Sequence, residues 1–105
     1  MLPIAIDVMS GDHPPPEYIA GALRALREAA ALRVLIVGDP ALIGPRVAAL
    51  TQALRARVGT APASEVVSMG DSPREAIRHK KDSSMRVAVD LVKSGRAAAC
   101  VSAGN

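Results

Sequence analysis

The fold is decided by the stretch Ile4-Ala5-Ile6-Asp7-Val8-Met9-Ser10-Gly11-Asp12, an apolar run that stops at a polar cluster containing glycine. The same order of features occurs three more times, and helical patterns lie between these segments. Apolar runs that alternate with helices indicate a parallel sheet covered by helices on both faces. The other runs and their clusters are Val34-Leu35-Ile36-Val37 with Gly38-Asp39, Val66-Val67 with Gly70-Asp71-Ser72, and Ala98-Ala99-Cys100-Val101 with Ser102-Ala103-Gly104-Asn105.

This arrangement also predicts where a ligand binds. The carboxyl ends of parallel strands point to one edge of the sheet, and ligands bind along that edge. We therefore expect polar clusters that are far apart in the sequence to gather into one site. A chain of 105 residues holds one domain at most. The sequence predicts an α/β fold with three layers, helix, mainly parallel sheet and helix, in a single domain.

The helices are predicted from apolar spacing and from their start and stop residues. The first begins in Pro14-Pro15-Pro16 and runs to about Ala31, and the second starts at Asp39-Pro40. Residues 59–63 are predicted to be a loop. A further helix starts at Ser72, and the last one has Lys93 in its final turn and Gly95 just beyond its end. The expected buried faces are Ile19, Ala22, Leu23, Leu26 and Ala30 in the first helix, Ile43, Val47, Leu50 and Leu54 in the second, and Met85, Ala88, Val89 and Val92 in the last.

Composition excludes several classes of function. Tyr18 is the only aromatic residue and the net charge is +3, which is a poor signature for nucleic-acid binding. Two histidines and one cysteine give no metal-ligand spacing, so no metal is expected. Cys100 lies in an apolar run and is predicted to be a small buried hydrophobe. No signal peptide and no run of about 20 apolar residues is visible, which predicts a cytosolic protein.

The first polar cluster carries two acidic residues and a glycine. Gly11 permits a sharp turn of the backbone close to a ligand. Asp7 and Asp12 are acceptors that can organise this loop, although ordinary turn and capping chemistry explains the same residues equally well. His13 stands beside three prolines and is the weakest candidate for a base or ligand.

Positive charge gathers around the predicted helix start that follows. Ser83 and Ser84 open a helix directly after Lys81, and free N–H groups, hydroxyls and cations together suit an anion. A solvated helix face with a serine cap is the plainer explanation. A third reading is a docking patch for an acidic partner, carried by Arg74, Arg78 and Lys80.

The last cluster, Ser102-Ala103-Gly104-Asn105, is the sharper signal. Successive N–H groups in a turn that contains glycine form a concavity that binds anions. The lysine of a P-loop and the three-glycine dinucleotide fingerprint are both missing, so ATP and NAD lose support and no cofactor is expected. A strand that ends in this cluster usually leads into a helix, and we expect that the sequence is truncated after Asn105.

Taken together, these segments resemble the phosphate acyltransferases of bacterial phospholipid synthesis, the PlsX family. The resemblance rests on four segments in the same order and spacing. Ser10 is a departure, because the family pattern usually has a second glycine there, and it is expected to stiffen the first loop. The family's enzymes are also roughly three times longer. The matching segments are Ile6-Asp7-Val8-Met9-Ser10-Gly11-Asp12, Val37-Gly38-Asp39, Arg78-His79-Lys80-Lys81-Asp82-Ser83-Ser84-Met85 and Val101-Ser102-Ala103-Gly104-Asn105.

The resemblance implies an activity and its partners. Family members transfer a long-chain acyl group from acyl carrier protein to inorganic phosphate without metal or nucleotide. They are homodimers in the cytoplasm that associate peripherally with the membrane, and a membrane glycerol-3-phosphate acyltransferase takes their product. Their fold is similar to that of isopropylmalate dehydrogenases and phosphate acetyltransferases. The 105 residues then form the N-terminal part of a single catalytic domain.

Two other functions stay open from the sequence. One is a short-chain phosphotransacylase or a dehydrogenase on the same fold, and the other is a non-catalytic piece that binds only an anion or a partner. No catalytic base is assigned, because no Ser–His or Cys–His pair is evident. The residues that we expect to bind phosphate are Lys81, Ser83, Ser84, Ser102, Gly104 and Asn105.

Overall fold

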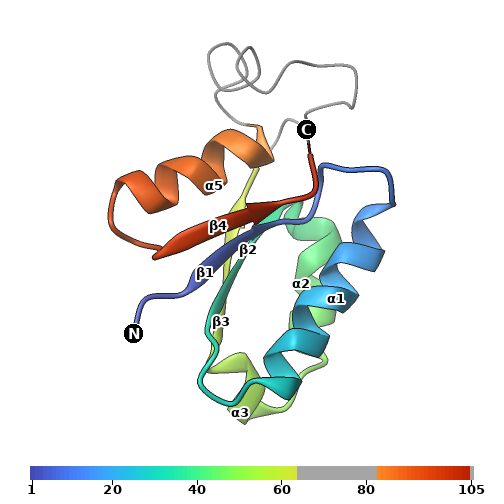
Figure 1. The fold of residues 1–105 in the computed structure, drawn as a ribbon. Coiled ribbons are helices and arrows are strands. Elements are labelled where there is room, and N and C mark those ends of the chain that lie inside the picture. Colours follow the sequence, from blue (N-terminus) through green and yellow to red (C-terminus); the bar gives the residue numbers. More distant parts are fainter. Residues whose placement is uncertain (64–82, 105) are drawn as a thin grey trace.

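The computed structural model describes residues 1–63 and 83–104. In that part of the chain four parallel strands form one sheet, in the order β3-β2-β1-β4 (Figure 1). The predicted parallel sheet is therefore confirmed. The strands are β1 (Ile4–Asp7), β2 (Val34–Gly38), β3 (Val58–Pro62) and β4 (Ala99–Ser102), and the helices are α1 (Pro15–Glu28), α2 (Pro40–Ala48), α3 (Gln52–Arg55) and α5 (Ser84–Lys93).

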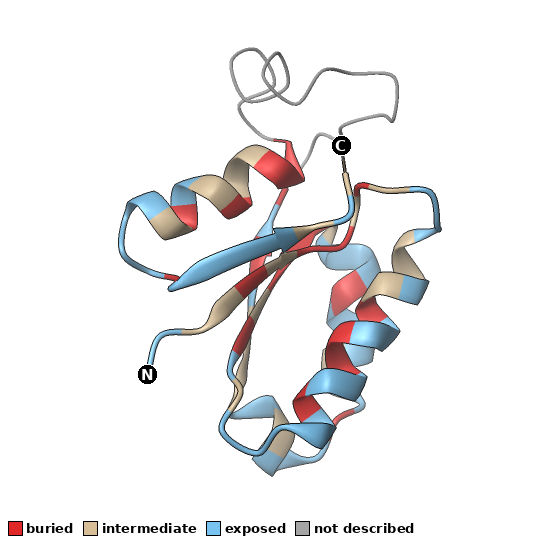
Figure 2. Ribbon diagram, in the orientation of Figure 1, coloured by how far each residue is buried: buried red, intermediate tan, exposed pale blue. Residues whose placement is uncertain are grey.

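Helices cover both faces of this sheet, so the three-layer prediction is also confirmed. Helices α1 and α2 lie on one face and α5 on the other (Figure 1). On the first face Ile19, Leu23 and Leu26 of α1 pack with Ile36 of β2. Figure 2 shows this buried stripe along the side of α1 that faces the strands. On the opposite face Ala88 and Leu91 of α5 pack with Ala5, Val37 and Ala61 from three strands.

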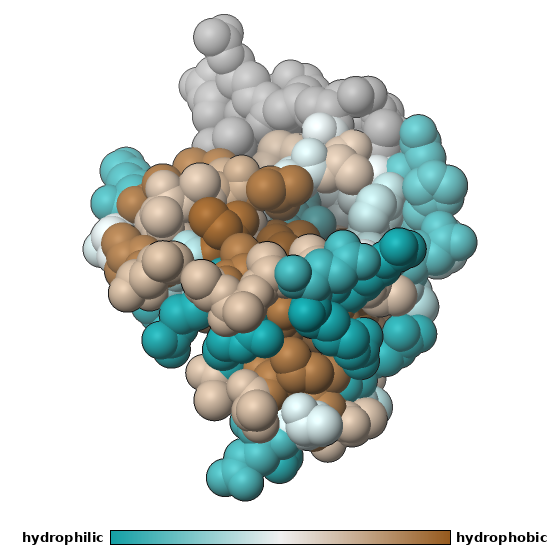
Figure 3. Space-filling view, turned by 60° about the horizontal axis from the view of Figure 1, so that its bottom comes forward, coloured by the Kyte–Doolittle hydropathy of each residue, from teal (hydrophilic) through white to brown (hydrophobic). Residues whose placement is uncertain are grey.

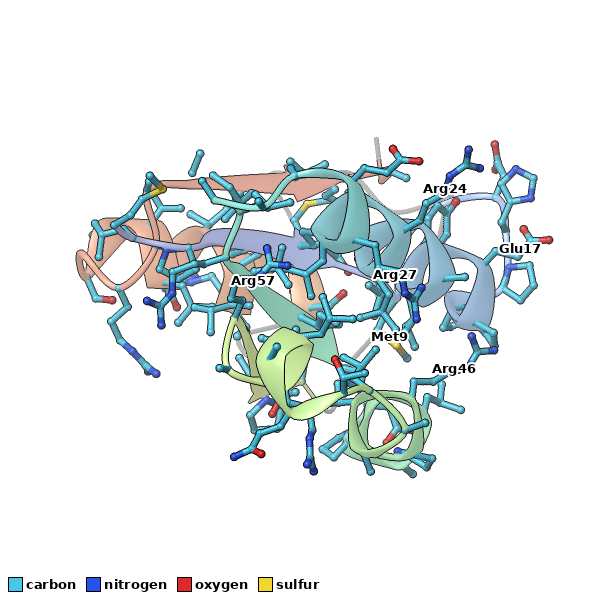
Figure 4. The ribbon with its side chains drawn as sticks, turned by 90° about the horizontal axis from the view of Figure 1, so that it is seen from below. Met9, Glu17, Arg24, Arg27, Arg46 and Arg57 are labelled. Atoms are coloured by element: carbon cyan, nitrogen blue, oxygen red, sulfur yellow. The ribbon has the colours of Figure 1, made fainter. Side chains whose placement is uncertain are left out.

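Helix α1 begins where the prolines predict. Proline fits the first turn of a helix because its missing N–H would have no partner inside the helix. The helix ends three residues earlier than expected, at Glu28. At this end of the helix the guanidinium of Arg57, which Figure 4 labels, donates hydrogen bonds to the carbonyl oxygens of Leu26, Ala29 and Leu32, at 3.0, 2.9 and 3.0 Å. Arg57 thus ties the end of α1 to the start of β3.

The second predicted helix is two helices in the structure. Asp39 caps α2 as expected, and its Oδ1 accepts a hydrogen bond from the N–H of Ala41 at 2.9 Å. Pro45 lies inside α2 without ending it. The chain leaves the helix after Ala48, and Thr51 starts α3 by accepting a hydrogen bond from the N–H of Leu54. A local cap therefore interrupts the apolar spacing that predicted one continuous helix.

The prediction of a loop at residues 59–63 is wrong, because Val58–Pro62 form strand β3. Glycine and proline lower strand propensity, but among the strands of the described residues β3 lies at the edge of the sheet, where both are tolerated. A Cβ at Gly59 would overlap the side chain of Leu35 on β2, so glycine gives that leucine its space. The strand predicted at Val66-Val67 lies outside the described residues.

The prediction that Cys100 is buried is also wrong, since its side chain is exposed. Within the described residues β4 pairs only with β1, and none of its four residues is buried. Val101, on the same strand, is 57% exposed. Figure 3 shows apolar surface interleaved with hydrophilic surface on the face that it presents. The apolar run at 98–101 predicts the strand correctly but not its burial.

Helix α5 buries Met85 and Ala88 as predicted, together with Leu91 rather than Val89 and Val92. The helix ends at Lys93, and Gly95 follows in a left-handed conformation, as the sequence indicates. Among the helices of residues 1–63 and 83–104, none has the length and apolar character needed to span a bilayer.

Candidate functional site

Asp7 is the centre of the polar cluster at the carboxyl edge of the sheet. It is the last residue of β1, and its side chain is only 2% exposed. Its Oδ1 accepts hydrogen bonds from the N–H groups of Met9 and Ser10 at 3.0 and 3.3 Å. Its Oδ2 accepts one from the hydroxyl of Ser102 at 2.7 Å. One carboxylate therefore fixes the loop after β1 and joins it to the end of β4, its register partner.

The loop after β4 folds back on the same serine. The N–H of Gly104 donates to Ser102 Oγ at 3.1 Å. A Cβ on Gly104 would lie 2.8 Å from Met85 Cε, 3.0 Å from Ser10 Cβ and 3.3 Å from Ser102 Oγ. These contacts show that the loop after β1, the start of α5 and the loop after β4 meet at one place. The gathering of distant polar clusters at this edge is what the parallel topology predicts.

Glycine at position 104 is explained by packing and not by a left-handed backbone. A positive φ is found at Gly11 and Gly95 among the described glycines, and not at Gly104. What position 104 requires is space, because Met85 and Ser10 already occupy the volume next to its Cα. A side chain at position 104 therefore has to displace Met85 Cε and crowd Ser10 Cβ, whatever the backbone conformation.

Ser83 and Ser84 begin α5 at this edge. Ser83 is the N-cap, and its Oγ accepts a hydrogen bond from the N–H of Arg86 at 3.1 Å. Ser84 Oγ lies 3.3 Å from the hydroxyl of Ser10. Both side chains are fully buried. A helix start leaves N–H groups without acceptors inside the helix and carries a partial positive charge, so this end of α5 favours an anion.

The rest of the loop after β1 is shaped by Gly11 and Tyr18. Gly11 has a φ of 123°, which confirms the sharp turn predicted there. The hydroxyl of Tyr18 accepts a hydrogen bond from the N–H of His13 at 3.1 Å, and His13 Nδ1 lies 2.9 Å from Glu17 Oε2. Asp12 is exposed and has no side-chain hydrogen bond to another residue of the described ranges. Its role in organising the loop stays a prediction.

Several predicted site residues cannot be placed. Lys81 and Asn105, both expected to bind phosphate, lie outside the described residues, as do the three docking residues, Arg74, Arg78 and Lys80. Four of the six residues that we expect to bind phosphate lie within the described residues. Ser83 and Ser84 come from the start of α5, Ser102 and Gly104 come from the end of β4 and its loop, and these two segments meet at the carboxyl edge of the sheet. Sequence reasoning missed the contact between Ser10 and Ser84, because no spacing rule relates residues that are 74 positions apart.

A separate hollow of about 450 Å³ lies between α1 and α2. Its lining is mostly apolar, with Leu23 and Leu50 among the lining residues, and it includes the arginines Arg27 and Arg46. Figure 4 shows these two arginines on the side where α1 and α2 face each other. Neither Asp7 nor Ser102 contributes to it, so the hollow is distinct from the site at the sheet edge.

Comparison with known proteins places the chain in a family. Residues 2–105 match the model of a family described as "fatty acid synthesis protein". The chain is 48% identical to a phosphate acyltransferase from Methylococcus capsulatus (strain ATCC 33009 / NCIMB 11132 / Bath), over all of this chain and 31% of the relative. It is 46% identical to a phosphate acyltransferase from Shewanella sp. (strain ANA-3), over 99% of this chain and 30% of the relative.

A third relative, a phosphate acyltransferase from Pseudomonas putida (strain GB-1), is 45% identical over 97% of this chain and 30% of its own length. The chain thus spans about 30% of the length of the curated relatives that it matches. Because the family model covers nearly every residue, the chain belongs to the fatty acid synthesis protein family, whose matching members are named phosphate acyltransferases.

Proposed function

We propose that these 105 residues are the N-terminal part of an enzyme that transfers a long-chain acyl group from acyl carrier protein to inorganic phosphate. The observation that carries the proposal is the meeting of two strand-end loops and a helix start around Asp7 and Ser102. The names of the relatives support an acyl transfer to phosphate. The product, acyl phosphate, would then supply phospholipid synthesis through a membrane glycerol-3-phosphate acyltransferase.

The chemistry needs an anion that is both held and aimed. An oxygen of hydrogen phosphate attacks the thioester carbonyl carbon, the C–S bond breaks, and the phosphate proton goes to the departing sulfur. Positioning phosphate within reach of the carbonyl lowers the entropic part of the barrier. Donors aimed at the carbonyl oxygen stabilise the charge that develops there. Direct attack requires no acyl-enzyme, in keeping with a site assembled from donors and loops.

The proposed phosphate site combines the start of α5 with the loop after β4. Ser102 and Gly104 are only partly buried and lie next to the surface, whereas Ser83 and Ser84 are fully buried. An anion that contacts the hydroxyls of Ser83 and Ser84 must therefore bind below the molecular surface. Asp7 holds the loops. The Ser102 hydroxyl donates to Asp7 and the Gly104 N–H donates to Ser102 Oγ, so an anion bound by these two donors has to replace those hydrogen bonds. The residues proposed for binding remain Lys81, Ser83, Ser84, Ser102, Gly104 and Asn105.

The test uses the full-length protein that carries this sequence. Palmitoyl-acyl carrier protein and phosphate are supplied together, and the release of free carrier protein is measured with and without phosphate. We expect release that depends on phosphate, by a cytoplasmic homodimer that associates peripherally with the membrane. Turnover of acetyl-CoA or of a nicotinamide cofactor, with no phosphate-dependent release, would falsify the proposal and favour a short-chain phosphotransacylase or a dehydrogenase.

Single substitutions then test the phosphate residues. Ser84→Ala is expected to weaken phosphate binding by about 1 kcal/mol, roughly fivefold, the usual value for one neutral hydrogen bond. Lys81→Ala is expected to cost more, because it removes a charge next to the anion. If both variants keep the phosphate affinity of the parent, the anion binds elsewhere and these residues serve only the fold.

A further inference from the structure

Ser10 contacts three segments of the site, and its place in the sequence does not predict these contacts. It lies three residues after Asp7, its side chain is fully buried, and its N–H donates to Asp7 Oδ1 at 3.3 Å. Its Oγ lies 3.3 Å from Ser84 Oγ. Its Cβ would be 3.0 Å from a Cβ on Gly104. The residue therefore stands between the start of α5 and the loop after β4, in contact with both.

These contacts form a continuous chain of hydrogen bonds across the edge of the sheet. It runs from Ser84 through Ser10 to Asp7, and from Asp7 through Ser102 to the N–H of Gly104. Each of these hydrogen bonds either connects two different segments of the protein or closes one loop. A displacement of Ser10 therefore changes its contact with Ser84 of α5. Through the carboxylate of Asp7 it also changes the contact with Ser102 of β4.

The two hydroxyls have two protons, and their mutual contact uses one of them. A serine hydroxyl donates once and accepts up to twice. Within the described residues neither hydroxyl has another side-chain partner. If Ser10 donates to Ser84, the Ser84 proton is left to be donated to a ligand. The 3.3 Å separation is longer than the 2.7–2.8 Å that is usual for hydroxyl pairs, and either hydroxyl can be the donor.

We propose that Ser10 is a positioning residue for phosphate, which donates its hydroxyl proton to Ser84 and so directs the Ser84 proton to the anion. This inference rests on the proposed function. It predicts a specific pattern: loss of the Ser10 hydroxyl weakens phosphate binding only while Ser84 keeps its own hydroxyl.

The experiment is a double-mutant cycle in the full-length protein, read by steady-state kinetics with phosphate as the varied substrate. Ser10→Ala is expected to raise KM for phosphate about 3- to 10-fold, the range for one neutral hydrogen bond, with kcat nearly unchanged. In the Ser84→Ala background Ser10→Ala should raise KM for phosphate by less than about twofold, because the Ser84 hydroxyl through which Ser10 acts is already absent. Ser10→Cys, which keeps a weak donor, is expected to fall between the parent and Ser10→Ala.

The matched control is Ser94→Ala. Ser94 is the C-cap of the same helix, and its hydroxyl donates to the carbonyl oxygen of Leu91 at 3.2 Å, at the opposite end from the site. Its substitution should leave KM for phosphate unchanged. An unchanged KM in Ser10→Ala, or an equal rise in both Ser84 backgrounds, overturns the proposal. Absence of phosphate-dependent turnover in the parent protein is a different result, because it overturns the proposed function before any variant is made.

Discussion

Replacement of Gly11 by alanine is expected to destabilise the protein through two separate effects. The first is backbone strain, because a φ of 123° is a conformation that residues with a Cβ rarely adopt. Holding a non-glycine residue in such a region costs about 1–3 kcal/mol. The second is a clash, since the new Cβ would overlap the hydroxyl of Tyr18 and lie 2.9 Å from Ala103 Cβ.

The clash has its own cost. The Tyr18 hydroxyl must move, and it then gives up the hydrogen bond that it accepts from the N–H of His13. That bond contributes about 1 kcal/mol. Together with the strain, Gly11→Ala should lower the free energy of unfolding by about 2–4 kcal/mol, a large share of the 5–15 kcal/mol typical of natural proteins.

Gly21→Ala is the matched control for this substitution. Gly21 lies on the exposed side of α1, and nothing is within 4 Å of the position where its Cβ would stand. Alanine inside a helix is more stable than glycine by about 0.5–1 kcal/mol. Urea unfolding of the parent and both variants should therefore move the midpoint in opposite directions. If Gly11→Ala unfolds within about 0.5 kcal/mol of the parent, the reasoning about its backbone and its neighbours is refuted.

Three further substitutions test other contacts. Gly104→Ala places a methyl group against Met85 and should cost about 1–3 kcal/mol by overpacking, with a higher KM for phosphate; an unchanged melting temperature and KM would contradict this. Arg57→Met keeps the apolar stem but removes three hydrogen bonds to carbonyl oxygens, so urea unfolding should show a free energy of unfolding lower by about 2–3 kcal/mol. A loss below about 1 kcal/mol would show that water replaces these hydrogen bonds. Asp39→Ala removes the cap of α2 and should cost about 1 kcal/mol in the same assay, and no loss would mean that the cap is dispensable.

The elements that the sequence predicts well are those with a strong local signal. Asp39 followed by proline marks the start of α2, and Gly95 marks the end of α5, because caps are decided by a few neighbouring residues. The layered fold follows from the order of apolar runs and helices. The convergence at the sheet edge follows from parallel topology, which brings Asp7 beside Ser102 although 95 positions separate them.

The errors fall where distant neighbours decide the outcome. Strand β3 contains glycine and proline, yet its pairing with β2 overrides their low propensity. Cys100 belongs to an apolar strand, but exposure depends on what packs over the strand and not on its own composition. Gly104 needs space beside Met85 and Ser10, two residues from other segments. Local patterns contain no information about such contacts.

The strand order has a consequence for the time at which strand β4 joins the described sheet. Of the four described strands, β1 is synthesised before the others and one of its partners, β4, after them, with Asp7 and Ser102 separated by 95 positions. At about 5–20 residues per second, a ribosome adds β4 some 5–20 s after β1. For that interval one edge of β1 has no β4 to pair with, while α1 and β2 can already pack on it. Pairing across such a long sequence separation is slow. The hydrogen bond between Ser102 and Asp7 therefore forms only after β4 has joined the sheet, and until then the loops after β1 and β4 are not held together.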